Sequence, residues 1–377
     1  MFSDQALVRD TSLLSNQGLV LYDCLCLRGG AEQLTLELVN GLPNTHLGFG
    51  FRNQDAFPNH EISHLTFFDL HAASNIPGWR ILKVMRAFAD RCAFINHYDW
   101  VIYSGSYAPL AVHWHPHGKN IYYCHTIPRF AYDLRNYYID NIPLLLRPLL
   151  LKLIENVKRH YEPAIRSMQI VIANSENVRR RLRHYLNREA TVIYPPIDTK
   201  AFRWQNQGDY YLSLARLEDF KRVDRIVAAF KRMPDKKLVV ASGGQQLAKL
   251  QKIAADAPNI RFTGWIDEAQ LQQLVGNAIA TLYIPIDEDF GMSPVESMAA
   301  GKPVIGVAEG GLLETVINGE TGVLLPENPY PEQIVETVLQ MTPERAQSMR
   351  TACEARAQLF SKEIFLKRMR ALIDDRE

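Results

Sequence analysis

Short apolar runs alternate with helical patterns along almost the whole chain, and this alternation limits its fold more than any other feature. In the first half, the strand-like runs are residues 18–27, 45–51, 64–68, 100–105, 120–125 and 170–175. The second half repeats the rhythm with runs at 210–217, 237–244, 259–265, 280–285, 303–307 and 321–325. Fully apolar strands that alternate with helices are typical of parallel sheets covered on both faces, so the chain is predicted to be α/β.

The length of 377 residues favours two domains over a single core. Between the two halves lies VIYPPIDTKAF (192–202), where Pro195-Pro196 can continue neither a helix nor a central strand. We therefore expect an N-terminal Rossmann-like domain at 1–195 and a C-terminal one at 196–357. Two such domains facing each other place a ligand cleft at the carboxyl ends of their strands. The last thirty-odd residues, from Pro343 onward, are strongly helical, and a break at Phe360-Ser361 predicts two helices there.

Composition narrows the class of protein. With 47% hydrophobic and 22% charged residues the chain resembles a soluble globular protein, and a net charge of +1 gives no electrostatic case for nucleic acid. Its five cysteines are an odd number without paired spacing, which favours a reducing compartment. The start MFSDQALVRDTS lacks the pattern of a signal peptide, and no apolar run is long enough for a bilayer span. We expect a cytoplasmic protein.

Residues 144–166 qualify this expectation. The stretch LLLRPLLLKLIENVKRHYEPAIR combines leucines with Arg147, Lys152, Lys158 and Arg159. Such a helix either packs its apolar side on the core or lies on the inner face of an anionic plasma membrane as a peripheral contact.

The most informative stretch is IPIDEDFGMSPVESMAAG (284–301), which follows a strand and opens a helix. Ser293 suits the N-cap and Glu296 falls three residues later, as in a capping box. The turn Phe290-Gly291 before a helix start suits a phosphate. Glu288 and Glu296 would repel that phosphate, so they more plausibly accept hydrogen bonds from sugar hydroxyls. The alternative for Glu296 is a capping role alone.

SLARLEDFKRVDRIV (213–227) supplies positive charge. Arg216 ends a strand and Lys221 begins the next helix, so both can point at the same ligand. Each alone could be an ordinary solvated cation. Together with the turn before residue 292 they would form a clamp for a diphosphate without metal.

Three motifs of this chain resemble those of the retaining glycosyltransferases with a glutamate–seven–glutamate motif: R216-x4-K221, E288-D-F-G-M-S-P-V-E296 and E-G-G-L-x-E-T-V-x-N-G. This family has the GT-B fold, in which two Rossmann-like domains face each other across a cleft. GGAE, CHTIPRFAYD and the ANSENV…VIYPPID run resemble the N-terminal domain of bacterial GDP-mannose-dependent mannosyltransferases in this family. Asp289 departs from the pattern, because a small residue is common there; it either reaches a sugar hydroxyl or points to solvent.

This resemblance implies roles for individual residues. Arg216 and Lys221 would bind the donor diphosphate, and Glu296 the ribose. The catalytic set would be His125, Glu288, Arg216 and Lys221, with His125 and Glu288 contacting the transferred sugar. The remaining donor contacts would be Gly29 and Gly30 at the phosphate, Trp265 and Ile266 at the base, and Phe290, Gly291, Met292 and Ser293 at the sugar and diphosphate. The final helix, about 358–377, would pack back on the N-terminal domain.

The function that follows is retaining, metal-independent transfer of a hexose, mannose from GDP-mannose, to a hydroxyl acceptor in envelope or exopolysaccharide synthesis. Its partners would be the nucleotide-sugar donor and a glycan or lipid-linked acceptor, with no further cofactor. A UDP-sugar donor, nucleotide-sugar epimerisation and a non-catalytic nucleotide-sugar-binding subunit remain as alternatives.

A histidine cluster raises a metal question. His113, His115 and His117 alternate, and on a strand they would share one face as zinc ligands do. Pro116 and Gly118 instead favour a polar loop at 113–119 near the acceptor, so no metal is expected. His125 follows a strand-like run and is the separate, active-site candidate.

Overall fold

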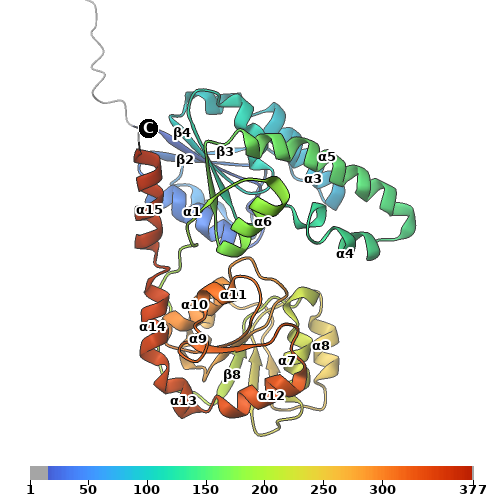
Figure 1. The fold of residues 1–377 in the computed structure, drawn as a ribbon, viewed down its shortest axis with the longest axis vertical. Coiled ribbons are helices and arrows are strands. Elements are labelled where there is room, and N and C mark those ends of the chain that lie inside the picture. Colours follow the sequence, from blue (N-terminus) through green and yellow to red (C-terminus); the bar gives the residue numbers. More distant parts are fainter. Residues whose placement is uncertain (1–15, 376–377) are drawn as a thin grey trace, which may run out of the picture. The chain divides into compact units, whose positions relative to one another are not determined.

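The computed structural model describes residues 16–375, which fall into two compact units (Figure 1). The first unit holds the chain up to Tyr123 together with Pro128–Val171, and the second holds Cys124–Ile127 and the chain from Ile172 onward. The MFSDQALVRDTS segment lies outside the described residues. The boundary expected at 195/196 remains a prediction.

Seven parallel strands form the first sheet, in the order β3-β2-β1-β4-β5-β6-β7. They are β1 (Gly18–Tyr22), β2 (Thr45–Phe49), β3 (Phe67–Asp69), β4 (Trp100–Ser104), β5 (Lys119–Cys124), β6 (Ile170–Ala173) and β7 (Thr191–Val192). Gly18 of β1 pairs with Thr45 on one side and Trp100 on the other. Every residue of β1 and β4 is buried, as fully apolar central strands require. The predicted α/β class is therefore confirmed.

The helices of the first unit are α1 (Gly30–Gly41), α2 (Asn59–Ile62), α3 (Pro77–Asp90), α4 (Arg135–Asp140) and α5 (Arg147–Arg166), with 3-10 turns η2 (Ala93–His97), η3 (Ala108–Trp114), η4 (Arg129–Ala131) and η5 (Leu144–Leu146). Both α3 and α5 pack against η3. The start of η3 is fixed by Asp23, whose carboxylate accepts the backbone N–H groups of Ser106, Tyr107 and Ala108 at 2.7–2.8 Å. Burial raises the pKa of Asp23 to about 6 despite these hydrogen bonds.

The second sheet has six parallel strands in the order β10-β9-β8-β11-β12-β13. They are β8 (Tyr210–Ser213), β9 (Lys237–Val240), β10 (Ile260–Phe262), β11 (Thr281–Tyr283), β12 (Val304–Val307) and β13 (Gly322–Leu325). The chain runs from β8 outward to β10, then returns to β11 beside β8 and runs outward on the other side. The loops after β8 and β11 thus leave adjacent strands in opposite directions, which is where open α/β sheets bind ligands.

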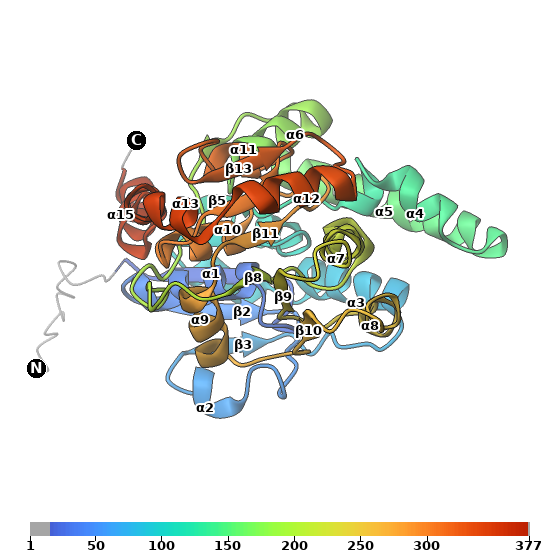
Figure 2. The ribbon, with the colours of Figure 1, turned by 90° about the horizontal axis from the view of Figure 1, so that it is seen from below.

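Helices cover this second sheet in two groups. Helix α6 (Glu176–Leu186) instead contacts β7 of the first sheet. The helices after it are α7 (Val223–Phe230), α8 (Leu247–Ile253), α9 (Glu268–Asn277), α10 (Met292–Ala299), α11 (Leu312–Thr315), α12 (Pro331–Gln340), α13 (Pro343–Ser348), α14 (Arg350–Gln358) and α15 (Lys362–Asp374), with the 3-10 turn η6 (Asp219–Lys221). One group is α7 with α8 and α12, and the other is α10 with α9, α11 and α14 (Figure 2). The helix of most interest, α10, starts directly after the loop that follows β11.

The tail breaks at Phe360-Ser361 as predicted, but it holds three helices and not two, because a further break at Met349 separates α13 from α14. α14 ends at Gln358, and α15 begins after Ser361, whose hydroxyl accepts the Ile364 N–H at 3.5 Å. At the break, Phe360 packs edge-on against Phe290 and Tyr194, with ring centroids 5.5 and 5.2 Å away. The crossing of α15 back onto the N-terminal domain remains a prediction.

Candidate functional site

Lys221 and Glu288 meet at the carboxyl ends of β8 and β11. The Lys221 ammonium donates to the Glu288 carboxylate and, at 3.1 Å, to the hydroxyl of Tyr283, the last residue of β11. Tyr283 in turn donates to the same Glu288 oxygen at 3.0 Å. Burial alone would lower the pKa of Lys221, but the charge of Glu288 holds it above its ordinary value. The structure thus brings two predicted site residues into one ion pair, and adds Tyr283, which the sequence reasoning missed.

The segment that carries Glu288 is closely packed by the glycine pair Gly310-Gly311. Gly310 has φ +55°, and a side chain there would clash with the Glu288 carbonyl; one at Gly311 would come within 2.5 Å of the Phe290 Cα. The Gly311 N–H donates to the Glu288 carbonyl at 2.8 Å. These glycines are therefore required by close approach, and they fix the backbone that presents Glu288.

Helix α10 begins earlier than its predicted capping box. Its N-cap is Gly291, with φ +89°, and Met292 is the first helical residue. The prediction of Ser293 as N-cap was wrong, because the left-handed Gly291 already turns the chain into the helix. Ser293 lies inside the first turn, where its carbonyl accepts the Ser297 hydroxyl at 2.8 Å. The first-turn N–H groups still follow the Phe290-Gly291 turn, as a phosphate site requires.

Glu296 lies one turn into α10 and does not act in a cap. Its side-chain carboxylate has no hydrogen-bond partner within residues 16–375, and burial, with the charge of Glu268 as a smaller contribution, raises its pKa to about 7. A largely buried carboxylate without donors is costly, and hydroxyl groups of a ligand would relieve that cost. This favours a ligand contact over the capping alternative.

Arg216 stands apart from the Lys221–Glu288 pair. Its side chain is 50% exposed and lies 3.7 Å from Glu218. No hydrogen bond or ion pair joins it to Lys221 or Glu288 in the part of the chain that the structure describes. Its predicted role therefore depends on a flexible, exposed side chain that can reach a diphosphate.

Trp265 is 68% exposed, and its indole covers Gly243, where a Cβ would lie 2.5 Å from Nε1. Ile266 packs partly buried against the core of the second unit. Gly243 follows β9 and its carbonyl accepts the Leu217 N–H at 3.0 Å. An exposed aromatic platform of this kind suits a nucleotide base. Gly243 was missed, although the glycine pair after the KLVVAS run was its signal.

His125 follows β5, as predicted. Burial lowers its pKa to about 4, so its imidazole is neutral near pH 7 and can act only as a hydrogen-bonding group. In the first unit, Gly29 is the N-cap of α1 and Gly30 its first residue. Gly29 has an ordinary φ of −106°, so only the neighbouring Glu32 side chain would meet a Cβ there.

The other histidines do not converge. His113 lies in η3, and its Nδ1 pairs with the Leu110 carbonyl at 2.9 Å. His115 is 1% exposed and uses both ring nitrogens, on Asn120 and on the Tyr98 carbonyl, each at 2.8 Å. The expectation of a polar loop over 113–119 was thus wrong at both residues, since His113 belongs to a helical turn and His115 is buried and structural. Within residues 16–375 no group of three His, Cys, Asp or Glu residues is arranged to hold a metal ion.

Two parallel sheets with helices on both faces, and a lysine–glutamate pair where adjacent strands of the second sheet diverge, form the fold of GT-B glycosyltransferases. Two family profiles agree: residues 28–201 match "Glycosyltransferase Family 4" and residues 196–359 match "Glycosyl transferases group 1". Both halves of the chain therefore match glycosyltransferase families, the second half the group 1 family.

Individual proteins are similar as follows. The alpha-1,3/1,6-mannosyltransferase ALG2 of Rhizomucor pusillus is 31% identical over a match that covers 37% of this chain and 42% of that protein. The chain matches less than half the length of this and the comparable ALG2 relatives. Among solved structures, Anabaena Alr3699/HepE in complex with UDP and glucose has a TM-score of 0.75 at 14% identity and covers 95% of this chain and 99% of its own. Sucrose-phosphate synthase from Thermosynechococcus elongatus has a TM-score of 0.76 at 20% identity, with coverage of 94% and 98%.

Proposed function

We propose that the chain is a retaining glycosyltransferase that moves mannose from GDP-mannose onto a hydroxyl acceptor, without a metal ion. The observation that carries this proposal is the Lys221–Glu288–Tyr283 cluster at the divergence of β8 and β11, one loop before α10. The similarity to ALG2 mannosyltransferases supports mannose. Glycan synthesis for the envelope or an exopolysaccharide is the setting we infer.

Cleavage of the bond between the anomeric carbon and the phosphate builds negative charge on the diphosphate. Lys221 has three N–H groups, and Glu288 and Tyr283 engage two of them, so the third is left for a phosphate oxygen. Arg216 and the first turn of α10 would stabilise the same charge. Glu288 and the neutral His125 would orient the sugar, and Glu296 the ribose.

Retention is proposed to arise from attack on the face that the diphosphate leaves. The new bond joins the acceptor oxygen to the anomeric carbon while the old bond to phosphate breaks. The departing phosphate oxygen takes the acceptor proton, so no side chain has to act as a covalent nucleophile. Lys221, Arg216 and the α10 N–H groups would then supply the charge stabilisation that a metal supplies elsewhere.

The test is a donor panel with a cell-envelope extract as acceptor and product detection by mass spectrometry. We expect hexosylated product with GDP-mannose in the presence of a chelator, and its loss in Glu288→Ala and Arg216→Ala variants that remain folded. Normal activity in either variant would overturn the assignment of the site. Turnover without acceptor would indicate an epimerase, and nucleotide binding with no product from any donor would indicate a non-catalytic subunit.

A UDP-sugar is the second candidate donor. The observation that favours it is the structural similarity to the Anabaena protein, which was solved with UDP and glucose. Competition between GDP-mannose and UDP-glucose in one assay separates the two, because the preferred donor suppresses product from the other.

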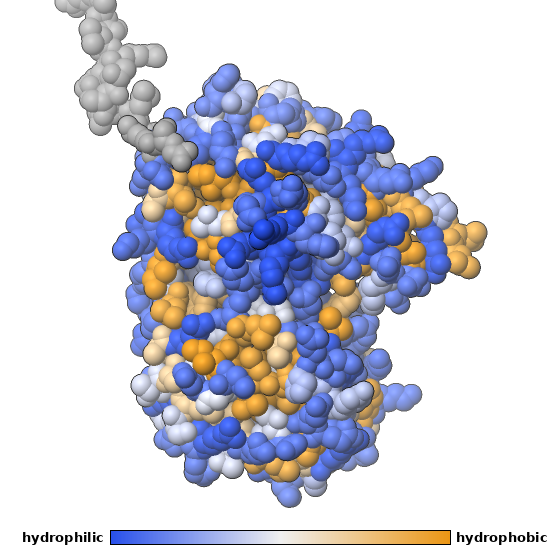
Figure 3. Space-filling view, in the orientation of Figure 1, coloured by the Kyte–Doolittle hydropathy of each residue, from blue (hydrophilic) through white to orange (hydrophobic). Residues whose placement is uncertain are grey.

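We further propose that the α4–α5 region of the first unit contacts an anionic bilayer as a peripheral site, which would suit a lipid-linked acceptor. Leu145 is 93% exposed and Leu144 and Leu149 are 73% and 67% exposed. Figure 3 shows hydrophobic side chains at the end of this region, and Figure 2 shows α4 and α5 reaching away from the sheet of their unit. Arg147 and Lys152 lie among these leucines and complement anionic headgroups. No helix within residues 16–375 is long and apolar enough to cross a membrane.

Vesicle flotation tests this contact. Leu145→Glu with Leu149→Glu should abolish binding to vesicles that contain anionic lipid. Leu339→Glu is the matched control, since Leu339 is a leucine of the second unit with 53% exposure. Unchanged flotation of the double variant would remove the membrane contact from the proposal.

A further inference from the structure

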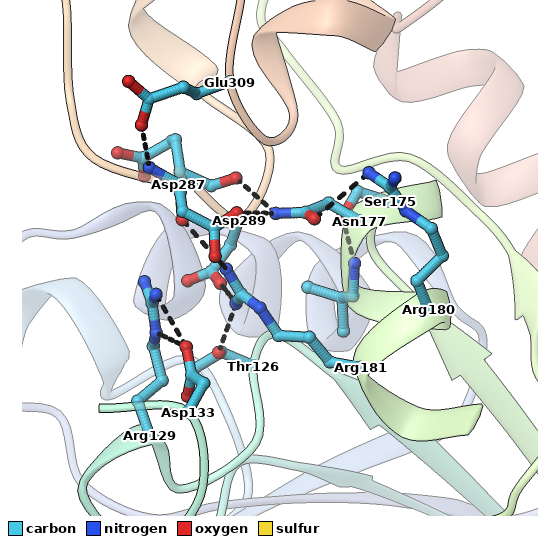
Figure 4. A network of polar contacts seen from close by, with 12 residues as sticks. Thr126, Arg129, Asp133, Ser175, Asn177, Arg180, Arg181, Asp287, Asp289 and Glu309 are labelled. Carbon is cyan, nitrogen blue, oxygen red and sulfur yellow. Dashed lines mark hydrogen bonds and ion pairs between the residues drawn. The ribbon is translucent and has the colours of Figure 1, made fainter. Parts of the chain in front are cut away.

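Three consecutive carboxylates, Asp287, Glu288 and Asp289, form the loop after β11. Lys221 pairs with the middle one, and the outer two share a different cation, Arg181 of α6 (Figure 4). The Arg181 guanidinium donates through Nη2 to the Asp287 carboxylate at 2.7 Å and through Nη1 to Asp289. Asp289, the departure from the family pattern, therefore neither points to solvent nor stands free to reach a sugar. It belongs to a bridge with α6.

Arg181 is placed with little freedom. Its side chain is only 7% exposed, and Nη2 also donates to the Asp287 carbonyl at 2.9 Å. Through Nη1 it contacts the hydroxyl of Thr126 at 3.3 Å, the residue directly after His125. One guanidinium thus joins the segment that carries His125 to the segment that carries Glu288.

A second side chain of α6 reinforces the same contact. Asn177 lies one turn before Arg181 on the same face of the helix, and its amide donates to the Asp287 carboxylate at 2.8 Å and to the Glu288 carbonyl at 2.9 Å. The start of α6 is itself anchored, because Glu314 accepts the backbone N–H groups of Glu176 and Asn177 at 2.6 and 2.8 Å. The carbonyl groups of Asp287 and Glu288 are therefore both fixed by α6.

Fixing these two carbonyl groups fixes the peptide units on either side of Glu288. Asp287 has φ +41°, a left-handed conformation that a non-glycine residue keeps only when its surroundings hold it there. A buried arginine between two carboxylates is not a reliable source of stability, because desolvation of the three charges offsets their attraction. Orientation of Glu288 is a better account of this arrangement than stability.

We propose that Arg181 is a positioning residue for glycosyl transfer: it holds the Glu288 segment and the His125–Thr126 segment in one fixed relation. The inference rests on the proposed function, since it assigns Arg181 to the same site. Arg181 does not touch the donor; it acts through Asp287, Asp289 and Thr126. Displacement of a catalytic group by about 1 Å is enough to reduce turnover about 10²-fold.

The test compares Arg181→Gln with Arg183→Gln. Arg183 is on the same helix, but its side chain is 74% exposed and pairs only at the surface with Glu189. Arg181→Gln should lower kcat about 10²-fold and change the Kd for GDP less than about threefold, because the diphosphate and ribose contacts remain. Arg181→Lys keeps the charge but not the fork of donors and should recover part of kcat. Arg183→Gln should match the wild type in both measurements.

Three results would overturn the inference. One is a folded Arg181→Gln variant with wild-type kcat, and another is a loss of GDP affinity as large as the loss of kcat. If Arg181→Gln fails to fold, Asp289→Asn takes its place. This variant leaves the ion pair between Arg181 and Asp287 intact and should lower kcat about tenfold. The third contrary result is unchanged turnover in Asp289→Asn. Wild-type protein that transfers no sugar from any nucleotide donor would remove the proposed function as well, and so is distinguished from failure of the inference alone.

Discussion

Lys221 provides the first prediction at the scale of single residues. Lys221→Met leaves the Glu288 carboxylate, 17% exposed, without its cation and removes the N–H assigned to phosphate. We expect kcat/KM for the donor to fall about 10²–10³-fold, the range found when one preorganised charge-stabilising donor is removed. Lys237→Met is the control, because Lys237 forms a surface pair with Asp209 at 62% exposure. Steady-state kinetics in which both variants behave alike would contradict the role of Lys221.

Glu296 provides a pH-dependent prediction. Its pKa is raised to about 7, whereas a ribose hydroxyl donates best to an ionised carboxylate. Nucleoside binding should therefore release a proton, and the affinity for guanosine should rise about tenfold between pH 6 and pH 8. Guanosine avoids the titration of the phosphate groups. Glu296→Gln should flatten this profile, and an equally steep profile in that variant, measured by calorimetry, would exclude Glu296 as the titrating group.

The raised pKa of Glu296 also makes the stability of the fold depend on pH. A carboxyl group whose pKa is raised on folding binds its proton more tightly in the folded state than in the unfolded state. Its contribution to the free energy of unfolding is therefore fully present below the ordinary pKa of 4.5 and is lost as the pH rises to about 7. Glu296→Gln should therefore be more stable than the wild type above pH 7 and nearly equal to it below pH 4.5. Urea unfolding at the two pH values measures the difference. A variant that is less stable at pH 8 would show that Glu296 has a compensating partner.

At the scale of elements, the glycine loop before α11 and the β11–α10 loop depend on each other. Gly310→Ala should displace the Glu288 backbone and lower kcat by about 10²-fold, because a Cβ there clashes with the Glu288 carbonyl. Gly319→Ala is a matched control: Gly319 also has a positive φ, +86°, but a Cβ there meets nothing within 4 Å. Both substitutions carry a conformational cost of about 1–2 kcal/mol. Equal activity of the two variants would contradict the coupling of the loops.

Helix α10 shows how far sequence patterns predict an element. The apolar run and the Phe290-Gly291 turn located both the strand and the helix, since these signals are local. The start was placed two residues late at Ser293, because the S-x-x-E pattern does not include the left-handed φ of Gly291. Long-range contacts outside the predicted donor site were not predicted. Arg181 and Asp287 lie 106 residues apart, and no periodicity connects them. The burial of His115 was also missed, because its contacts with Asn120 and the Tyr98 carbonyl follow no periodic pattern.

At the scale of the whole molecule, the residues predicted to bind the donor are divided unequally between the two units. Gly29 and Gly30 belong to the first unit, whereas His125, Arg216, Lys221, Trp265, Glu288 and the α10 residues belong to the second. The alternation of strands and helices predicted both sheets, but it could not assign the short segment Cys124–Ile127, because that depends on which neighbours it packs against. The nucleotide should therefore stabilise the second unit above all.

Amide hydrogen exchange with and without GDP tests whether the nucleotide binds mainly to the second unit. At 100 times the Kd, GDP should add about 2.7 kcal/mol to the free energy of unfolding of the unit that binds it. Amides of 216–221, 243–266 and 286–296 should exchange more slowly, whereas α3 and α5 should be unaffected. Slower exchange at 28–32 would support the phosphate contact of Gly29 and Gly30. In Glu296→Gln the protection of the second unit should weaken at pH 8, where the wild-type carboxylate is mostly ionised. Protection confined to the first unit would contradict the assignment of the donor site to the strands β8 and β11.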